Sequence, residues 1–139
     1  MSDASWHGGG CHCGAVTFAV QAHLDGDDAH EVVLCNCSIC RLKGFVHLIV
    51  EQDAFRITQG EEHLSTYTFG THTAKHMFCS RCGIHPFYRP RSHPEGWSVN
   101  ANALDAVREG RMKVRDLPTV PFDGQNWEEN IEALLVAES

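Results

Sequence analysis

The two segments CHCG (residues 11–14) and CSRCG (residues 79–83) decide the fold of this 139-residue chain. Each segment brings two cysteines close together and places a glycine directly after the second cysteine. A metal knuckle turns its backbone tightly so that amides point at the thiolate sulfurs, and the next residue often needs a positive φ, which glycine adopts without strain. Cys11, Cys13, Cys79 and Cys82 therefore predict one closed, tetrahedral four-thiolate zinc site of the structural kind, which joins the first strand to a late hairpin.

A third segment, CNCSIC (residues 35–40), contains the other three of the seven cysteines. Cys35, Cys37 and Cys40 are followed by Arg41 instead of a glycine. Three protein ligands leave a tetrahedral zinc with one open position, which is the arrangement of catalytic zinc sites. The cysteines thus predict two zinc ions per chain, one structural and one catalytic, with no cysteine left over.

Three other uses of the cysteines fit the sequence less well. A disulfide framework conflicts with the odd number of cysteines and with the close spacing within each segment. A thioredoxin-like motif should open a helix, whereas CSRCGIHPFY resembles a turn that leads into a strand. A DNA-binding zinc ribbon conflicts with the acidic charge and with the third cysteine of CNCSIC.

Length and composition indicate one globular domain over residues 1–139, with 42% apolar and 21% charged residues. No apolar run approaches the roughly 20 residues of a membrane span, and the first residues, MSDASWHGGG, lack the features of a secretory signal. We therefore expect a cytoplasmic protein, where thiols stay reduced. The formal net charge of -7 gives no electrostatic reason to bind nucleic acid or an anionic membrane. The oligomeric state is not predicted.

Short β-branched and aromatic runs separated by Gly, Pro, Asp and Asn indicate a mainly β domain. Strands are expected at residues 15–20, 31–35, 44–50, 55–60, 64–69, 74–79, 86–90 and 96–101. Residues 104–107 are expected to form one helical turn, and residues 116–125 an extended connection. Asn126 and Glu129 resemble a capping box, and the apolar spacing that follows predicts a C-terminal helix over residues 127–136.

A zinc held by three thiolates is a soft, weakly acidic metal, so it favours a sulfur ligand in its open position over hydrolysis through bound water. A substrate thiol bound there becomes a thiolate, ready to attack an electrophilic carbon such as that of an aldehyde. Arg41 and Asn36 are candidates for substrate or supporting contacts. Other cations that can pair with carboxylates of an anionic thiol are Lys43, Arg89 and Arg91. Histidines that are expected to pack or hydrogen-bond rather than bind metal are His12, His47, His72, His76, His85 and His93.

The segments CHCGAV, CNCSICR, FCSRCGIHPFY and WSVNANALD resemble the glutathione-dependent formaldehyde-activating enzyme family, which includes centromere protein V. FYRPRSHPEGWSVNANALD and DGQNWE are most similar to the centromere protein V branch, and the resemblance runs from about residue 7 to 130. It implies a β-tent fold of short antiparallel strands with a structural and a catalytic zinc. By resemblance, the structural zinc takes the cysteines of the CxC and CxxC pairs, and the catalytic zinc takes Cys35, Cys37 and Cys40.

The family's activity is the condensation of formaldehyde with glutathione to S-(hydroxymethyl)glutathione, formally a carbon–sulfur lyase reaction in reverse. The resemblance therefore implies a zinc-dependent carbon–sulfur lyase-type enzyme that acts on an aldehyde adduct of glutathione or another thiol. The alternative is a non-catalytic protein, either a glutathione carrier or a zinc-stabilised interaction module.

Overall fold

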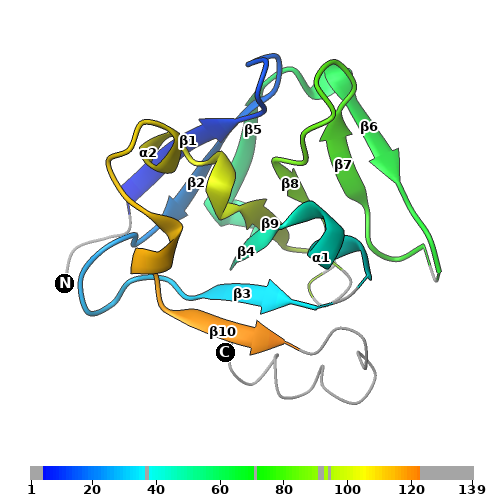
Figure 1. The fold of residues 1–139 in the computed structure, drawn as a ribbon. Coiled ribbons are helices and arrows are strands. Elements are labelled where there is room, and N and C mark those ends of the chain that lie inside the picture. Colours follow the sequence, from blue (N-terminus) through cyan, green and yellow to red (C-terminus); the bar gives the residue numbers. More distant parts are fainter. Residues whose placement is uncertain (1–4, 37, 71, 91–92, 94, 123–139) are drawn as a thin grey trace.

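The computed structural model describes residues 5–36, 38–70, 72–90, 93 and 95–122, and it is mainly β (Figure 1). The strands are β1 Ser5–Gly10, β2 Thr17–Ala22, β3 Val32–Cys35, β4 Val46–Val50, β5 Phe55–Gln59, β6 Leu64–Tyr67, β7 His76–Cys79, β8 Phe87–Tyr88, β9 Trp97–Asn100 and β10 Thr119–Phe122. The α-helices are α1 Ser38–Lys43 and α2 Asp105–Arg108. Single 3₁₀ turns are η1 Gln52–Ala54, η2 Glu61–His63, η3 Ala101–Ala103 and η4 Val114–Asp116. In the described part of the chain, no helix is long and apolar enough to cross a membrane.

The strands form three sheets, in the orders β1-β2-β5, β10-β3-β4-β9-β8 and β6-β7. All pairs are antiparallel except β10 with β3, which run parallel. Figure 1 shows the β6–β7 hairpin standing apart from the three-stranded sheet, with β8, β9 and α1 between them. The two cysteine knuckles follow β1 and β7, so they lie at the ends of strands from different sheets.

The main core lies between the three-stranded and the five-stranded sheet. Phe18 and Phe55 come from the first sheet, and their rings contact Phe87 and Trp97 of the second, with centroids 5.7 Å apart for Phe18–Phe87 and 4.5 Å for Phe55–Trp97. Such aromatic pairs contribute about 0.5–1.5 kcal/mol each beyond the burial of their area. The aromatic residues of the predicted strands thus hold the two sheets together.

The five-stranded sheet has two faces of different chemistry. Side chains alternate along a strand, so Leu48 and Val50 of β4 join the main core, whereas His47 and Ile49 point to the opposite side. Ser98 of β9 pairs with Ile49 and therefore shares this second face. We call the second face of this sheet, together with α1, the reactive face, because it also carries cysteines of the CNCSIC segment.

Eight strands predicted from the sequence are confirmed as β2 to β9, with ends shifted by up to two residues. The helical turn expected at residues 104–107 is α2, one residue further on. Within the extended connection predicted for residues 116–125, residues 119–122 are extended and also pair with β3 as strand β10. The predicted helix at residues 127–136 lies outside the described residues.

Three elements were not expected from the sequence. The strand β1 has three consecutive glycines, which disfavour strands, but Gly9 packs so closely that a Cβ there would lie 2.3 Å from Phe18 Cζ. The strand β10 contains Pro121, which is tolerated because β10 is an edge strand. Helix α1 is short, yet Gly44, directly after it, was a visible signal for a helix end.

Candidate metal centre and reactive face

Four cysteine sulfurs come together where the two knuckles meet. The sulfur atoms of Cys11, Cys13, Cys79 and Cys82 all lie within 4.8 Å of one another. Both the Cys11–Cys13 and the Cys13–Cys79 separation are 3.7 Å. A tetrahedral zinc with Zn–S bonds of about 2.3 Å requires sulfur separations of about 3.8 Å. The donor set and its spacing therefore fit one zinc ion, as the sequence predicts for these four residues.

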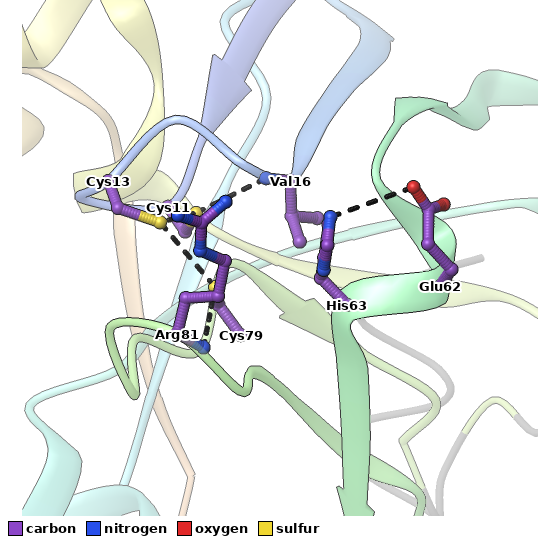
Figure 2. A network of polar contacts seen from close by, with 7 residues as sticks. All are labelled: Cys11, Cys13, Val16, Glu62, His63, Cys79 and Arg81. Carbon is purple, nitrogen blue, oxygen red and sulfur yellow. Dashed lines mark hydrogen bonds and ion pairs between the residues drawn. The ribbon is translucent and has the colours of Figure 1, made fainter.

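The knuckle geometry explains why each cysteine pair precedes a glycine. Gly14 and Gly83 have φ of 80° and 78°, values that favour glycine. Backbone amides point at the sulfurs: Val16 N donates to Cys11 Sγ at 3.3 Å and Arg81 N to Cys79 Sγ at 3.4 Å (Figure 2). These donors stabilise thiolates, so the local backbone is already arranged for metal binding.

The thiols strongly affect one another's ionisation. Burial raises the pKa of Cys82, but hydrogen bonds from the backbone of Cys13 and Ile84 and from neighbouring thiols outweigh it and bring the pKa to about 6. The Ala15 backbone lowers the pKa of Cys13, whereas desolvation and three neighbouring thiols raise it to about 11. Four thiolates this close repel one another unless a cation is present, and a divalent ion supplies that charge.

Two of the three cysteines predicted for the catalytic site lie at the reactive face. Cys35 ends β3 and packs beside Val33, Ile49 and Phe122, and Cys40 is buried in α1. Cys37 lies outside the described residues. The three-cysteine zinc site therefore stays a prediction, although both described members come from adjoining elements of one face.

The end of α1 holds Cys40 in place. Phe45 N donates to Cys40 O at 3.3 Å and Gly44 N to Arg41 O at 3.4 Å, which is the paired hydrogen-bond pattern of a Schellman helix end. Gly44 has a φ of 64°. The buried Phe45 side chain follows directly, so the helix that carries Cys40 is joined to β4 by a fixed turn.

Buried polar side chains gather at the same face. Among the described residues, the buried polar or charged ones are His47, His76 and Ser98, and all three lie at the reactive face or against it. His47 Nδ1 lies 3.0 Å from Ser98 Oγ and 3.2 Å from Tyr88 Oη. The hydrogen-bonded position in the core that was predicted for His47 is confirmed. Ser98 and Tyr88 were not singled out, but their strand neighbours are apolar, which was a usable signal.

Lys43 lies at the same place, at the last position of α1. Its Nζ is 3.3 Å from His76 Nδ1, 5.0 Å from the centre of the Phe45 ring and 5.2 Å from that of Tyr88. In Figure 1, α1 lies between β4 and the β6–β7 hairpin, as this contact with β7 requires. Burial and then the charge of Lys43 lower the pKa of His85 to about 4, although a hydrogen bond to the Met77 backbone opposes both.

The other predicted contact residues have separate positions. Arg41 and Asn36 are exposed beside the cysteines, and Asn36 N donates to Phe122 O at 3.2 Å. Arg89 instead lies over the Trp97 ring, 3.7 Å from its centre, and donates to Gly96 O at 2.9 Å. Its guanidinium thus has a structural role, and burial lowers its pKa. Arg91 lies outside the described residues.

A cavity of about 1230 Å³ lies around the ends of β2 and β4; no described cysteine lines it, although its wall includes Ile49, which packs beside Cys35. Its lining includes five carboxylate side chains: Asp28, Glu31, Glu51, Asp53 and Glu95. An anionic thiol such as glutathione is repelled by such a lining. The volume of this cavity is therefore no reason to place thiol chemistry there, and the cysteine-bearing face remains the candidate site.

The fold and the cysteine centre define a mainly β protein with a four-thiolate site that is compatible with zinc. Residues 6–116 match the family described as glutathione-dependent formaldehyde-activating enzyme, and the chain belongs to this family. A crystal structure of a Rhodobacter sphaeroides protein is similar, with 37% sequence identity and a TM-score of 0.67, and the match covers 81% of this chain and 99% of that chain. The resemblance drawn from the cysteine segments is thereby confirmed.

Proposed function

We propose that the chain is a single-domain enzyme that joins glutathione to an aldehyde, with formaldehyde as the first candidate, and that also runs the reverse carbon–sulfur cleavage. In this proposal Cys35, Cys37 and Cys40 hold a second, reactive zinc, while the four-cysteine centre is structural. Family membership supports glutathione and formaldehyde as the substrate pair. The cytoplasm is the proposed location, where glutathione is the abundant thiol.

The observation that carries this proposal is the separation of the two cysteine groups. Four sulfurs already complete a closed cluster. Cys35 and Cys40 lie outside it, on the sheet face that also carries the buried His47 and Ser98 and in the helix that ends at Lys43. A structural site has no need for such neighbours, whereas a reaction that creates charge on oxygen does. The chemistry of the reactive face thus favours turnover over a second purely structural metal.

The protein's own residues have distinct parts in this scheme. When bound to the three cysteines, zinc would supply a place where the substrate thiol is held as a thiolate. Arg41 is exposed one residue after Cys40 and can pair with a carboxylate of glutathione. Asn36 lies between two of the cysteines and can contact the same substrate. His47, Ser98 and Tyr88 form a hydrogen-bonded polar base on the same sheet face as Cys35.

The experiment that tests the proposal measures the exchange between free formaldehyde and S-(hydroxymethyl)glutathione, with and without protein, by NMR. The condensation also occurs spontaneously, so the enzyme must raise the exchange rate above that background. We expect saturable acceleration that Cys35→Ser abolishes while its circular dichroism stays that of the wild type. A protein that binds glutathione but leaves the exchange rate unchanged is a carrier, and one that does neither is an interaction module.

A further inference from the structure

Lys43 is held in an enclosure of rings at the reactive face. Its ammonium contacts the faces of Phe45 and Tyr88 at 5.0 and 5.2 Å and hydrogen-bonds to His76 Nδ1 at 3.3 Å. The rings around Lys43 also contact one another. The centres of the Tyr88 and Phe45 rings lie 5.2 Å apart in an edge-to-face arrangement, and the His76 ring stacks on Tyr88 with centres 4.8 Å apart. Lysine side chains are normally flexible and strongly hydrated, so this one has an unusually defined position.

The position of Lys43 relative to the cysteines follows from the backbone. Cys40 and Lys43 are three residues apart in α1, so they lie on neighbouring parts of one helix side. Cys35 lies one position beyond the last β3–β4 pair, Leu34–Val46, next to the place where Phe45 enters β4. The lysine enclosure therefore adjoins both described cysteines of the proposed reactive site.

The reaction proposed above gains from a positive group near the thiolate. When a thiolate adds to an aldehyde, negative charge develops on the aldehyde oxygen, and a fixed donor in a partly desolvated site stabilises it well. The cysteines provide no such donor. Lys43 provides a full charge and N–H donors, and its Nζ is held by His76 Nδ1 at 3.3 Å.

We propose that Lys43 is the catalytic residue that binds and protonates the aldehyde oxygen, and that His76 positions it. This inference rests on the proposed function. As the thiolate sulfur bonds to the aldehyde carbon, the carbon–oxygen π pair moves to oxygen, which takes a proton from the Lys43 ammonium. The resulting neutral amine regains the proton that the next glutathione thiol releases when it ionises. In the cleavage direction the amine takes the proton of the adduct's hydroxyl group.

The test uses the full zinc-loaded chain and compares Lys43→Met with Lys75→Met. Lys75 is an exposed lysine of the neighbouring hairpin whose Nζ donates to His72 O at 2.8 Å, so it controls for a lost surface charge. We expect Lys43→Met to lower kcat for the NMR exchange by about 100-fold or more, the usual effect of removing an oxyanion donor. The Kd for glutathione, measured by calorimetry, should stay unchanged, and Lys75→Met should keep the full kcat.

Two further variants sharpen the assignment. Lys43→Arg keeps the charge but cannot release its proton, because a guanidinium stays protonated in proteins. Its kcat should therefore lie between that of Lys43→Met and that of the wild type. His76→Phe keeps the ring stack and removes Nδ1, so it should lower kcat without changing the Kd for glutathione. Zinc content and circular dichroism establish that each variant is folded, and Lys43→Gln replaces Lys43→Met where the latter is not.

Results that would overturn the role of Lys43 differ from the result that would overturn the proposed function. A normal kcat in folded Lys43→Met overturns the assignment. A weaker Kd for glutathione with unchanged kcat also overturns it, because Lys43 would then bind a substrate carboxylate. If the wild-type protein itself gives only the spontaneous exchange rate, the proposed function fails and this inference with it. The first two results require an active wild-type enzyme, so they leave the proposed function standing.

Discussion

Cys13 and Cys79, which are 66 positions apart in the sequence, have sulfur atoms 3.7 Å apart. This relationship joins the end of the first strand to the end of the β6–β7 hairpin. A small β domain with three separate sheets gains much from one crosslink between distant segments, because metal binding contributes directly to the free energy of folding. The two knuckles thus explain how the β1-β2-β5 sheet and the β6-β7 hairpin are held together at one centre.

The first prediction concerns this crosslink. Cys79→Ser removes a buried ligand of the closed site, so we expect loss of both the fold and the metal, observed as insoluble or unfolded protein by circular dichroism. Cys35→Ser is the matched control, because it changes a cysteine outside the cluster and should keep the wild-type spectrum. A soluble, fully folded Cys79→Ser protein contradicts the structural role of this site.

The second prediction concerns the knuckle backbone. Gly83 has a φ of 78° and nothing within 4 Å of an added Cβ, so Gly83→Ala introduces backbone strain alone. We expect a loss of about 1–2 kcal/mol in the free energy of unfolding, measured by thermal unfolding at fixed zinc concentration. In Gly8→Ala the new Cβ meets only the movable Asp105 carboxylate, so its effect should be clearly smaller. Equal stability losses would show that the knuckle φ is unimportant.

The third prediction concerns the polar base of the reactive face. Ser98 is fully buried and bonds to His47, so Ser98→Ala leaves a buried ring nitrogen with one partner fewer. The free energy of unfolding should fall by about 1–3 kcal/mol. Ser5→Ala, at an exposed position of β1, should change it by less than about 0.5 kcal/mol. Urea titrations of both variants measure the difference, and a neutral Ser98→Ala would count against a tightly held network.

The fourth prediction is a pH dependence at His85. Its folded-state pKa of about 4 lies below the ordinary value of 6.5, so below pH 6.5 the unfolded chain binds more protons than the folded one. Stability from the neutral ring is therefore complete above pH 6.5 and is lost as the pH falls toward 4. Because the side chain of His85 is partly exposed and solvent screens it, the effect on the free energy of unfolding is expected to be about 1–2 kcal/mol.

The variant His85→Gln lacks this titration. As the pH falls from 7 to 5, the thermal midpoint of His85→Gln should therefore rise relative to that of the wild type. Any release of zinc by acid affects both proteins alike. A difference between the two midpoints that stays constant over this range would show that His85 is not held neutral by its surroundings.

The sequence allowed the metal centre to be predicted residue by residue, because the glycine after each cysteine pair records a local backbone requirement that survives in any fold. The strands were also predictable, because β-branched and aromatic residues favour them locally. The strand β1 was not, because its Gly9 is needed for close packing against Phe18, which only the assembled fold reveals. Tertiary packing thus overrides local propensity at this position.

The reactive face was only partly predictable. The spacing of CNCSIC indicated an open zinc site, and Lys43 was among the cations considered. Its enclosure by Phe45, His76 and Tyr88 depends on bringing α1, β4, β7 and β8 together, and no local pattern encodes that meeting. The sequence therefore predicted the cysteines of the proposed site and gave no signal for the ring contacts of Lys43.

One closed and one open zinc site are proposed for this chain, and native mass spectrometry with added glutathione counts both zinc ions and the bound thiol in a single experiment. We expect two zinc ions and one bound glutathione for the wild-type chain. For Cys35→Ser we expect one zinc ion and no glutathione. A wild-type chain that carries one zinc ion and binds no glutathione would contradict the two-site scheme.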